Sequence, residues 1–309
     1  MAFRLRKLRG LRQAGFRLCH GVPSELSSPS MKSLLQWPSL LLCWVLTLGA
    51  EFQDTQPWPA AEVDQWRGFR RQRFSVAGCE AWVVEPIKPA RGKPWTWCME
   101  FPDAFTERTG VTNLLGQGFH HLHLVVGNTF GCPAALDQFD QFYRIITNRG
   151  LARRGALIGI SRGGLYAYNW AARHPDRVST IYGDAPVCDF KSWPGGRGAG
   201  PGSPPDWRKL IQDYRFRDES EALSFRGNPI DQLLPLAKAG IPLLHVVGDD
   251  DPVVPVPENT AIVEQRYKTA GGTIRVIHKP GIGHHPHGLD DPTPVVEFIK
   301  TAAKSADSR

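Results

Sequence analysis

Net charge is nearly absent from the chain beyond its first 50 residues. The formal net charge of the 309 residues is +7, and residues 1–50 contribute +6 of it, which leaves +1 for the remainder. Proteins that bind nucleic acid through their surface carry a basic patch or stripe on the folded domain. The charge of this chain therefore does not indicate nucleic-acid binding, and we expect no nucleic-acid partner.

The sequence also lacks an uninterrupted apolar run long enough to span a membrane. The apolar stretch at 33–50 is broken by Gln36 and Pro38, whereas a spanning helix needs about 20 apolar residues. It follows a lysine and ends in two small residues, which is the pattern of a secretory signal peptide. We expect residues 1–50 to be a leader, with a basic extension before a start at Met31. The mature protein is then secreted or periplasmic, without stable membrane insertion.

Cysteine is scarce, with six residues in the chain and four beyond the predicted leader. In an oxidising compartment one or two disulfides could form. The alternative is four unpaired, buried small side chains. Sequence does not choose among the three ways of pairing four cysteines. The pairing stays open among Cys79, Cys98, Cys132 and Cys188.

What is present is the alternation of strand and helix patterns that is typical of an α/β domain. The composition, 41% hydrophobic and 22% charged, is ordinary for one large globular domain. Short apolar or alternating runs predict strands at 72–77, 79–85, 94–101, 121–126, 156–160, 180–183, 242–247 and 273–277. Other runs predict helices at 106–115, 134–147, 163–174, 206–214, 219–225, 260–270 and 294–303.

This order of elements predicts a mostly parallel sheet of about eight strands with helices on both faces. The first two strands look antiparallel and would form one edge of the sheet. We expect residues 51–71 to be a loose lead-in and residues 72–305 to be the folded domain. An insertion at about 190–235, which has a loop rich in glycine and proline and two short helices, interrupts the alternation. We interpret it as a cap over a site.

The stretch 156–172 contains the motif on which a catalytic prediction depends. The apolar run 156–160 leads into Gly159-Ile-Ser-Arg-Gly163, and a helix-forming run follows. Glycine on each side of Ser161 leaves room for a very tight turn between a strand and a helix. This arrangement is the nucleophile elbow, G-x-S-x-G, and it makes Ser161 the candidate nucleophile.

A nucleophilic serine needs a base to take its proton and a carboxylate to hold that base. In a parallel sheet these groups come from loops at the carboxyl ends of strands. One such loop is Gly248-Asp-Asp-Asp-Pro-Val-Val-Pro255, and the next contains His284-His-Pro-His287. The residues alone leave several candidates: Asp249, Asp250, Asp251 or the strand-ending Asp184 as the acid, and His284, His285 or His287 as the base.

Histidines in this sequence also allow other interpretations. His284, His285 and His287, together with Asp290 and Asp291, could bind a metal. The serine elbow makes that the weaker interpretation, so we expect neither a metal nor a cofactor. Three further histidines adjoin a buried strand, and we expect them to be core or strand-end residues: His120, His121 and His123.

From about residue 72 to 303 the chain resembles the α/β-hydrolase superfamily. Within it, the chain looks like secreted bacterial esterases or dienelactone-hydrolase-type and prolyl-oligopeptidase-like members. The resemblance lies in Gly159-Ile-Ser-Arg-Gly163, Gly248-Asp-Asp-Asp-Pro-Val-Val-Pro255 and Gly281-Ile-Gly-His-His-Pro286, and in the order serine, aspartate, histidine. It implies Ser161 as the nucleophile, Asp251 as the orienting acid and His284 as the base.

The oxyanion hole is expected to use the backbone N–H of Arg162, the residue after the nucleophile. In relatives the second donor comes from the loop after the third strand. Here that loop reads Glu100-Phe-Pro-Asp103 and lacks the His-Gly of many relatives. Because Pro102 has no N–H, Phe101 is the expected second donor.

The Arg162 side chain has three candidate roles. Its guanidinium could help to hold the oxyanion, bind a substrate carboxylate, or pair with a structural carboxylate. Ser-Arg at this turn is similar to glucuronoyl esterases, which implies acidic sugars as substrates. The lysine that follows in the motif of those enzymes is missing here.

Two tryptophans of the insertion, Trp193 and Trp207, could stack on a sugar ring or simply pack the cap.

The serine elbow, the candidate acid and base, the insertion and the expected export together predict a serine hydrolase that cleaves carboxylic esters of small molecules or carbohydrates. The alternatives are a small serine peptidase and a non-catalytic binding protein on the same fold. Residues 51–71 leave no space for the N-terminal propeller of many peptidase relatives, which favours the esterase.

Overall fold

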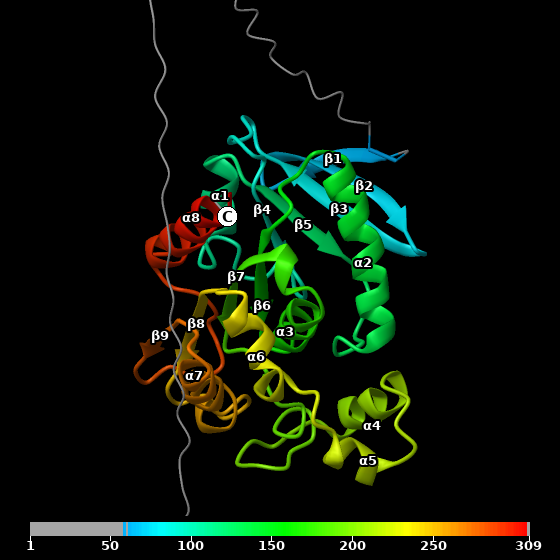
Figure 1. The fold of residues 1–309 in the computed structure, drawn as a ribbon, viewed down its shortest axis with the longest axis vertical. Coiled ribbons are helices and arrows are strands. Elements are labelled where there is room, and N and C mark those ends of the chain that lie inside the picture. Colours follow the sequence, from blue (N-terminus) through cyan, green and yellow to red (C-terminus); the bar gives the residue numbers. More distant parts are fainter. Residues whose placement is uncertain (1–57, 60, 308–309) are drawn as a thin grey trace, which may run out of the picture. The chain divides into compact units, whose positions relative to one another are not determined.

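The computed structural model describes residues 58–59 and 61–307. The leader predicted for residues 1–50 lies outside them, and so does the proposed start at Met31. The described chain forms a nine-stranded sheet of order β1-β2-β3-β5-β4-β6-β7-β8-β9 (Figure 1). The strands are β1 Glu62–Trp66, β2 Phe69–Val76, β3 Cys79–Glu85, β4 Trp95–Cys98, β5 His120–Leu124, β6 Gly155–Ile160, β7 Val178–Asp184, β8 Leu243–Gly248 and β9 Ile274–Lys279.

The pairing of the strands confirms the predicted fold class. The pairs β1-β2, β2-β3 and β3-β5 are antiparallel, and every pair from β5-β4 to β8-β9 is parallel. Strands β6 and β7 are buried along their whole length. Continuous burial explains why the apolar run at 156–160 could be identified as a strand in the middle of a parallel sheet.

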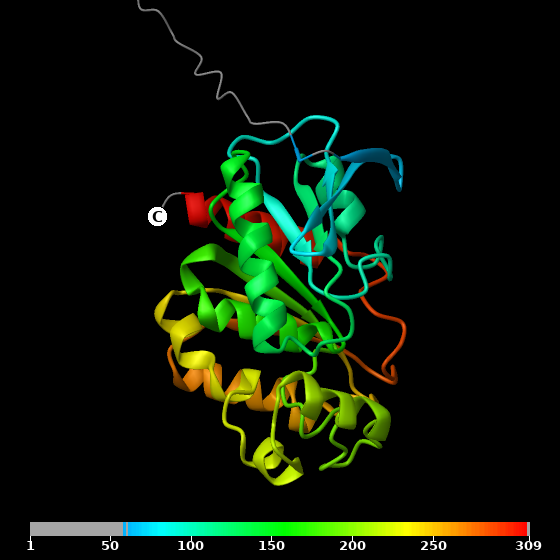
Figure 2. The same ribbon diagram turned by 90° about the vertical axis from the view of Figure 1, so that its right-hand side faces the viewer.

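Helices cover both faces of the sheet (Figures 1 and 2). Side chains of α1 and α8 pack with residues from one face, such as Ile158 and Ile160. Side chains of α2, α3, α6 and α7 pack with residues from the other, such as Leu157. The helices are α1 Val111–Gly116, α2 Pro133–Asn148, α3 Gly163–Arg173, α4 Pro204–Asp213, α5 Glu219–Ser224, α6 Leu233–Lys238, α7 Thr260–Thr269 and α8 Thr293–Asp307.

The strand β1 is the main departure from the predicted elements. It lies in the segment expected to be a loose lead-in, and β2 already begins at Phe69. Only Trp66 of β1 is buried. The strand is instead tied to β2 by cross-strand ion pairs, because Arg71 donates to both carboxylate oxygens of Asp64 at 2.8 and 2.6 Å. A polar edge strand of this kind has no hydrophobic pattern to reveal it.

The first predicted helix is also shorter than expected. It was predicted over 106–115, but α1 begins at Val111, after Gly110 in the left-handed conformation with φ 76°. A side chain at Gly110 would also collide with Val296 of α8, since an added Cβ would lie 2.6 Å from its Cγ2. Turns therefore occupy the residues before Gly110, and the helix starts only after it.

The insertion between β7 and β8 contains α4, α5 and α6. Its first two helices, α4 and α5, lie below α2 and α3 in Figure 1. The cysteines Cys79, Cys98, Cys132 and Cys188 are all free thiols, so none of the possible disulfides is present among the described residues.

Within 58–59 and 61–307, no helix has the length and apolarity needed to cross a lipid bilayer.

Candidate active site

Ser161 occupies the tight turn between β6 and α3. Its φ of 50° places a non-glycine residue in the left-handed region, which costs conformational energy and is found at functional turns. The turn is held on both sides, because the Ser161 N–H donates to the Asp184 carbonyl at 2.9 Å and its own carbonyl accepts from Val187 N–H at 2.8 Å. These bonds give the hydroxyl a fixed position at the carboxyl end of the sheet.

The glycines around Ser161 are required by close backbone contacts. A Cβ added to Gly159 would lie 3.0 Å from the Gly163 carbonyl oxygen. At Gly164 an added Cβ would lie 2.6 Å from the Val187 carbonyl oxygen. Strand and helix can approach this closely only where both lack side chains.

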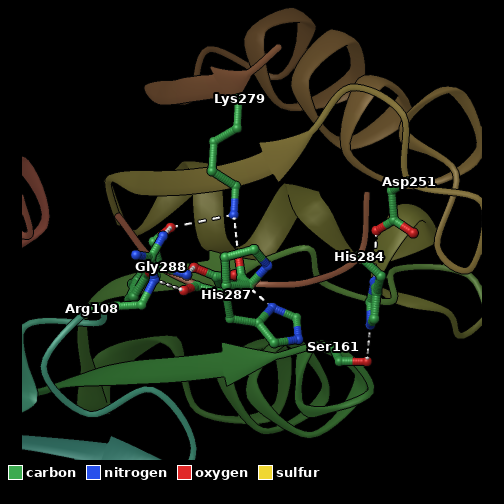
Figure 3. A network of polar contacts seen from close by, with 10 residues as sticks. Arg108, Ser161, Asp251, Lys279, His284, His287 and Gly288 are labelled. Atoms are coloured by element: carbon green, nitrogen blue, oxygen red, sulfur yellow. Dashed lines mark hydrogen bonds and ion pairs between the residues drawn. The ribbon is translucent and has the colours of Figure 1, made fainter. Parts of the chain in front are cut away.

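Ser161, His284 and Asp251 form one hydrogen-bonded chain (Figure 3). Ser161 Oγ lies 2.9 Å from His284 Nε2. On the other side of the ring, His284 Nδ1 lies 2.7 Å from Asp251 Oδ2. The three residues come from the β6–α3 turn, the loop after β9 and the loop after β8, as the predicted topology requires. The structure thus brings together the three residues that the resemblance implied.

Backbone amides fix the carboxylate of Asp251. Its Oδ1 accepts hydrogen bonds from the N–H groups of Val253 and Val254 at 2.8 and 2.9 Å. Burial alone would raise the pKa of Asp251, but the bonds from His284, Val254 and Val253 outweigh it and hold the pKa below the usual value. The rivals Asp249 and Asp250 are exposed, and Asp249 pairs with His278 instead. Of the three aspartates in this loop, Asp251 is the one that contacts His284.

A second histidine–carboxylate pair lies beside the first. His287 Nδ1 is 2.7 Å from Oδ1 of the fully buried Asp184. Oδ2 of Asp184 accepts from the Gly288 N–H at 2.8 Å and from the Tyr182 hydroxyl. Asp184, a candidate acid in the sequence, therefore does not contact His284. It anchors the loop that carries His284.

Two cations bind backbone carbonyls of the same loop (Figure 3). Lys279 Nζ donates to the Pro286 carbonyl at 2.6 Å and to the Gly288 carbonyl at 3.3 Å. Arg108 Nε donates to the His287 carbonyl at 2.8 Å. Burial lowers the pKa of Lys279. The loop is thus fixed by the charged side chains of Asp184, Lys279 and Arg108. The spacing of residues within the histidine motif does not reveal these contacts.

The side chain of Arg162 is committed to a neighbouring carboxylate. Its Nε and Nη2 donate to Glu100 Oε1 at 3.1 and 2.8 Å. The guanidinium carbon also lies 4.8 Å from the centre of the Phe101 ring. Of the three roles considered from the sequence, pairing with a structural carboxylate is the one that the structure contains.

The backbone around Phe101 lies close to the elbow. A Cβ added to Gly163 would lie 3.2 Å from Glu100 Cβ. Phe101 has φ 57°, again in the left-handed region. Within the described part of the chain, the N–H groups of Arg162 and Phe101 donate to no protein acceptor. Both predicted oxyanion donors are therefore free to bind a ligand.

The two tryptophans of the insertion differ in their surroundings. Trp207 is only 6% exposed, packs on Phe190 and donates from Nε1 to Glu219 at 2.9 Å. A ring buried in this way cannot stack on a sugar, so Trp207 does not fit its predicted role. Trp193 is partly exposed and packs against Phe130 at 6.3 Å between ring centroids. It remains a prediction.

The insertion contacts the loop that carries Asp251. A Cβ added to Gly200 would lie 3.2 Å from the carbonyl oxygens of Pro252 and Val253. Ser192 Oγ donates to Glu258 at 2.5 Å, just beyond that loop. Among the described residues, none from the insertion hydrogen-bonds to the side chain of Ser161 or His284.

Comparisons with known proteins agree with this architecture. No model of a protein family matches the sequence, and a search of curated proteins finds no match. A puromycin-hydrolyzing peptidase of Mycobacterium tuberculosis aligns with 15% identity over 78% of this chain and 39% of its own, with a TM-score of 0.55. An S-formylglutathione hydrolase from Agrobacterium tumefaciens aligns with 14% identity over 79% of this chain and 98% of its own, with a TM-score of 0.54.

Dipeptidyl peptidase 4 of Porphyromonas gingivalis aligns with 16% sequence identity and a TM-score of 0.56. The alignment covers 82% of this chain and 36% of the peptidase chain. This chain thus spans well under half of the two peptidases and nearly all of the S-formylglutathione hydrolase. At such identities the similarity defines the fold. The chain has the α/β-hydrolase fold, as its sequence predicted.

Proposed function

We propose that this protein is a serine hydrolase that cleaves carboxylic esters through an acyl-enzyme. The observation that carries the proposal is the hydrogen-bonded chain from Asp251 through His284 to Ser161, with Ser161 at φ 50° in a strand–helix turn. A serine in this arrangement is an activated nucleophile. The fold places all three groups at the carboxyl end of the parallel strands, where such sites are built.

In the proposed reaction, Ser161 Oγ attacks the ester carbonyl carbon while His284 Nε2 takes the hydroxyl proton. Asp251 accepts the hydrogen bond from His284 Nδ1 and stabilises the imidazolium that forms. The N–H groups of Arg162 and Phe101 bind the oxyanion of the tetrahedral intermediate. His284 then gives its proton to the leaving alcohol, and a water molecule releases the acyl group from Ser161 by the same steps.

The substrate class and the location are also proposed. A partly exposed Trp193 in the insertion supports an ester of a carbohydrate, since an aromatic ring can stack on a sugar. The signal-peptide pattern at 31–50 supports export to the periplasm or the medium. A small serine peptidase is the second candidate, because two of the structures with the same fold are peptidases.

The test uses the chain without its first 50 residues. We expect it to hydrolyse p-nitrophenyl acetate and to lose that activity in Ser161→Ala. A panel of acetylated sugars, sugar-acid esters and short peptides then separates esterase from peptidase. Labelling of Ser161 by a fluorophosphonate, absent in Ser161→Ala, gives a readout that does not depend on the substrate. Equal activity in both proteins, or no labelling, would contradict the serine mechanism.

A further inference from the structure

Three imidazoles meet beside Ser161. His284, His285 and His287 each place one ring nitrogen within 4.8 Å of the other two. Their ring centroids are 4.8 to 5.0 Å apart. The proposed mechanism transfers protons through His284 alone, and the pair of His287 with Asp184 anchors the loop without explaining why the three rings meet.

Two of the three rings are held by a carboxylate on Nδ1, which leaves Nε2 as the nitrogen that could bind a metal, although Nε2 of His284 also contacts Ser161 Oγ at 2.9 Å. Nδ1 of His284 faces Asp251 at 2.7 Å, and Nδ1 of His287 faces Asp184 at 2.7 Å. Because a carboxylate accepts hydrogen bonds, each neutral ring carries its proton on Nδ1 and its lone pair on Nε2. A carboxylate behind a histidine is also the arrangement that orients histidine ligands of zinc.

The distances suit a metal after a small adjustment. Zinc binds histidine nitrogens at ~2.0–2.1 Å, so two nitrogens of a tetrahedral site lie about 3.3 Å apart. Nitrogens within 4.8 Å therefore need to approach by about 1.5 Å at most. His285 is exposed and is the ring with the most freedom to move.

Asp290 and Asp291, the nearby carboxylates that could have served as metal ligands, have other partners. Asp290 pairs with Arg108, and Asp291 Oδ1 accepts from the Thr293 N–H at 3.0 Å. The cluster is therefore three imidazoles without a carboxylate ligand. Imidazole suits Zn²⁺ rather than the hard cations Mg²⁺ or Ca²⁺.

We propose that His284, His285 and His287 form an inhibitory Zn²⁺ site. A metal bound to His284 Nε2 occupies the lone pair that accepts the Ser161 proton. Metal binding and proton transfer are then mutually exclusive at one atom. The inhibitory effect rests on the proposed function, whereas the metal site itself does not.

The test has one readout for activity and one for binding. We expect Zn²⁺ to inhibit p-nitrophenyl acetate hydrolysis at micromolar concentration and EDTA to restore it. Each variant is compared with its own metal-free rate. His285→Gln and His287→Gln should each raise the half-inhibitory concentration at least about tenfold, since each removes one ligand. His278→Gln, at an exposed histidine paired with Asp249, is the matched control and should not change it.

Calorimetry with ZnCl₂ on Ser161→Ala tests the site without activity. We expect one Zn²⁺ per chain, with the binding lost or weakened at least tenfold in Ser161→Ala/His285→Gln. Absence of binding, or equal binding with and without His285, would overturn the site. One bound Zn²⁺ in a protein whose hydrolytic activity does not depend on Ser161 would support the site and overturn the proposed reaction.

Discussion

Arg162 and Glu100 join the two loops that supply the proposed oxyanion donors. Arg162 follows Ser161, and Glu100 precedes Phe101. Both hydrogen bonds from the guanidinium end on the same oxygen, at 3.1 and 2.8 Å. Burial raises the pKa of Glu100 above its usual value, although Arg162 acts in the opposite direction. The pair therefore fixes how far the Arg162 and Phe101 amides lie from each other.

The first prediction concerns this pair. Arg162→Ala should lower kcat for p-nitrophenyl acetate roughly 10- to 100-fold, less than the loss of a direct oxyanion donor, with little change in KM. The reason is that the Phe101 amide loses its fixed position. Arg162→Lys should restore only part of the rate, because lysine cannot donate two bonds from a planar group. Arg91→Ala, on the surface, is the control. A raised KM with normal kcat would instead place Arg162 in substrate binding.

The second prediction distinguishes the neighbouring aspartates. Asp251→Asn should lower kcat by about 10³- to 10⁴-fold, because the amide no longer holds His284 in the correct tautomer. Asp250→Asn changes an exposed carboxylate one residue away and should leave kcat unchanged. Steady-state kinetics of both variants decide the matter. Similar losses in the two would point to disturbance of the whole loop rather than to a role of Asp251.

Most of the sheet, and the segments that form the site, follow from local sequence. The run 156–160 is apolar because β6 is covered on both faces, and Gly159 is required by the close approach of Gly163 and Gly164 within the same turn. Such features leave a pattern over a few residues. The structure confirms the fold that this pattern predicted.

Other features depend on contacts between distant segments and could not be read locally. The sequence offers four aspartates as the acid, and the choice of Asp251 depends on the path of the loop after β8. The Asp184–His287 pair joins residues 103 positions apart. Trp207 is buried by Phe190 and Glu219, and nothing in its sequence neighbourhood distinguishes it from Trp193. Long-range packing decides each of these.

The third prediction compares two adjacent glycines at the start of α3. Gly164→Ala should lower the free energy of unfolding by about 1–3 kcal/mol, because its Cβ would lie 2.6 Å from the Val187 carbonyl oxygen. Gly163→Ala meets Glu100 Cβ at 3.2 Å, with the nearest backbone atoms at 3.7 and 3.9 Å, and gains helix propensity, so its loss of stability should be smaller than that of Gly164→Ala. Urea unfolding measures both. A larger loss in Gly163→Ala would contradict the geometry of the turn.

The fourth prediction concerns stability in acid. Burial lowers the pKa of His121 and His245 to about 3 and that of His120 and His123 to about 4. These histidines are neutral in the folded protein and bind protons on unfolding below pH 6.5. Their contribution to stability is therefore complete above pH 6.5 and is lost as the pH falls, down to about 4 for His120 and His123 and about 3 for His121 and His245.

Each buried histidine adds a slope of about 1.4 kcal/mol per pH unit in that window. We expect urea unfolding to show a steep decline between pH 6 and 5, and His245→Gln to reduce the slope by about one proton. A free energy of unfolding that is flat from pH 7 to 5 would contradict the burial of these rings.

Strand β9 ends the sheet and hydrogen-bonds to β8 alone. Ile274 is its only buried residue, and its last residue, Lys279, leads into the loop that carries His284. Ser161, by contrast, follows β6, which is fully buried in the middle of the sheet. Edge segments with few buried contacts open at a lower free energy than the core. Fraying of this one margin would withdraw Lys279 from the carbonyls of Pro286 and Gly288 and leave the histidine loop held by Asp184 and Arg108, so the proposed activity would weaken before the protein melts.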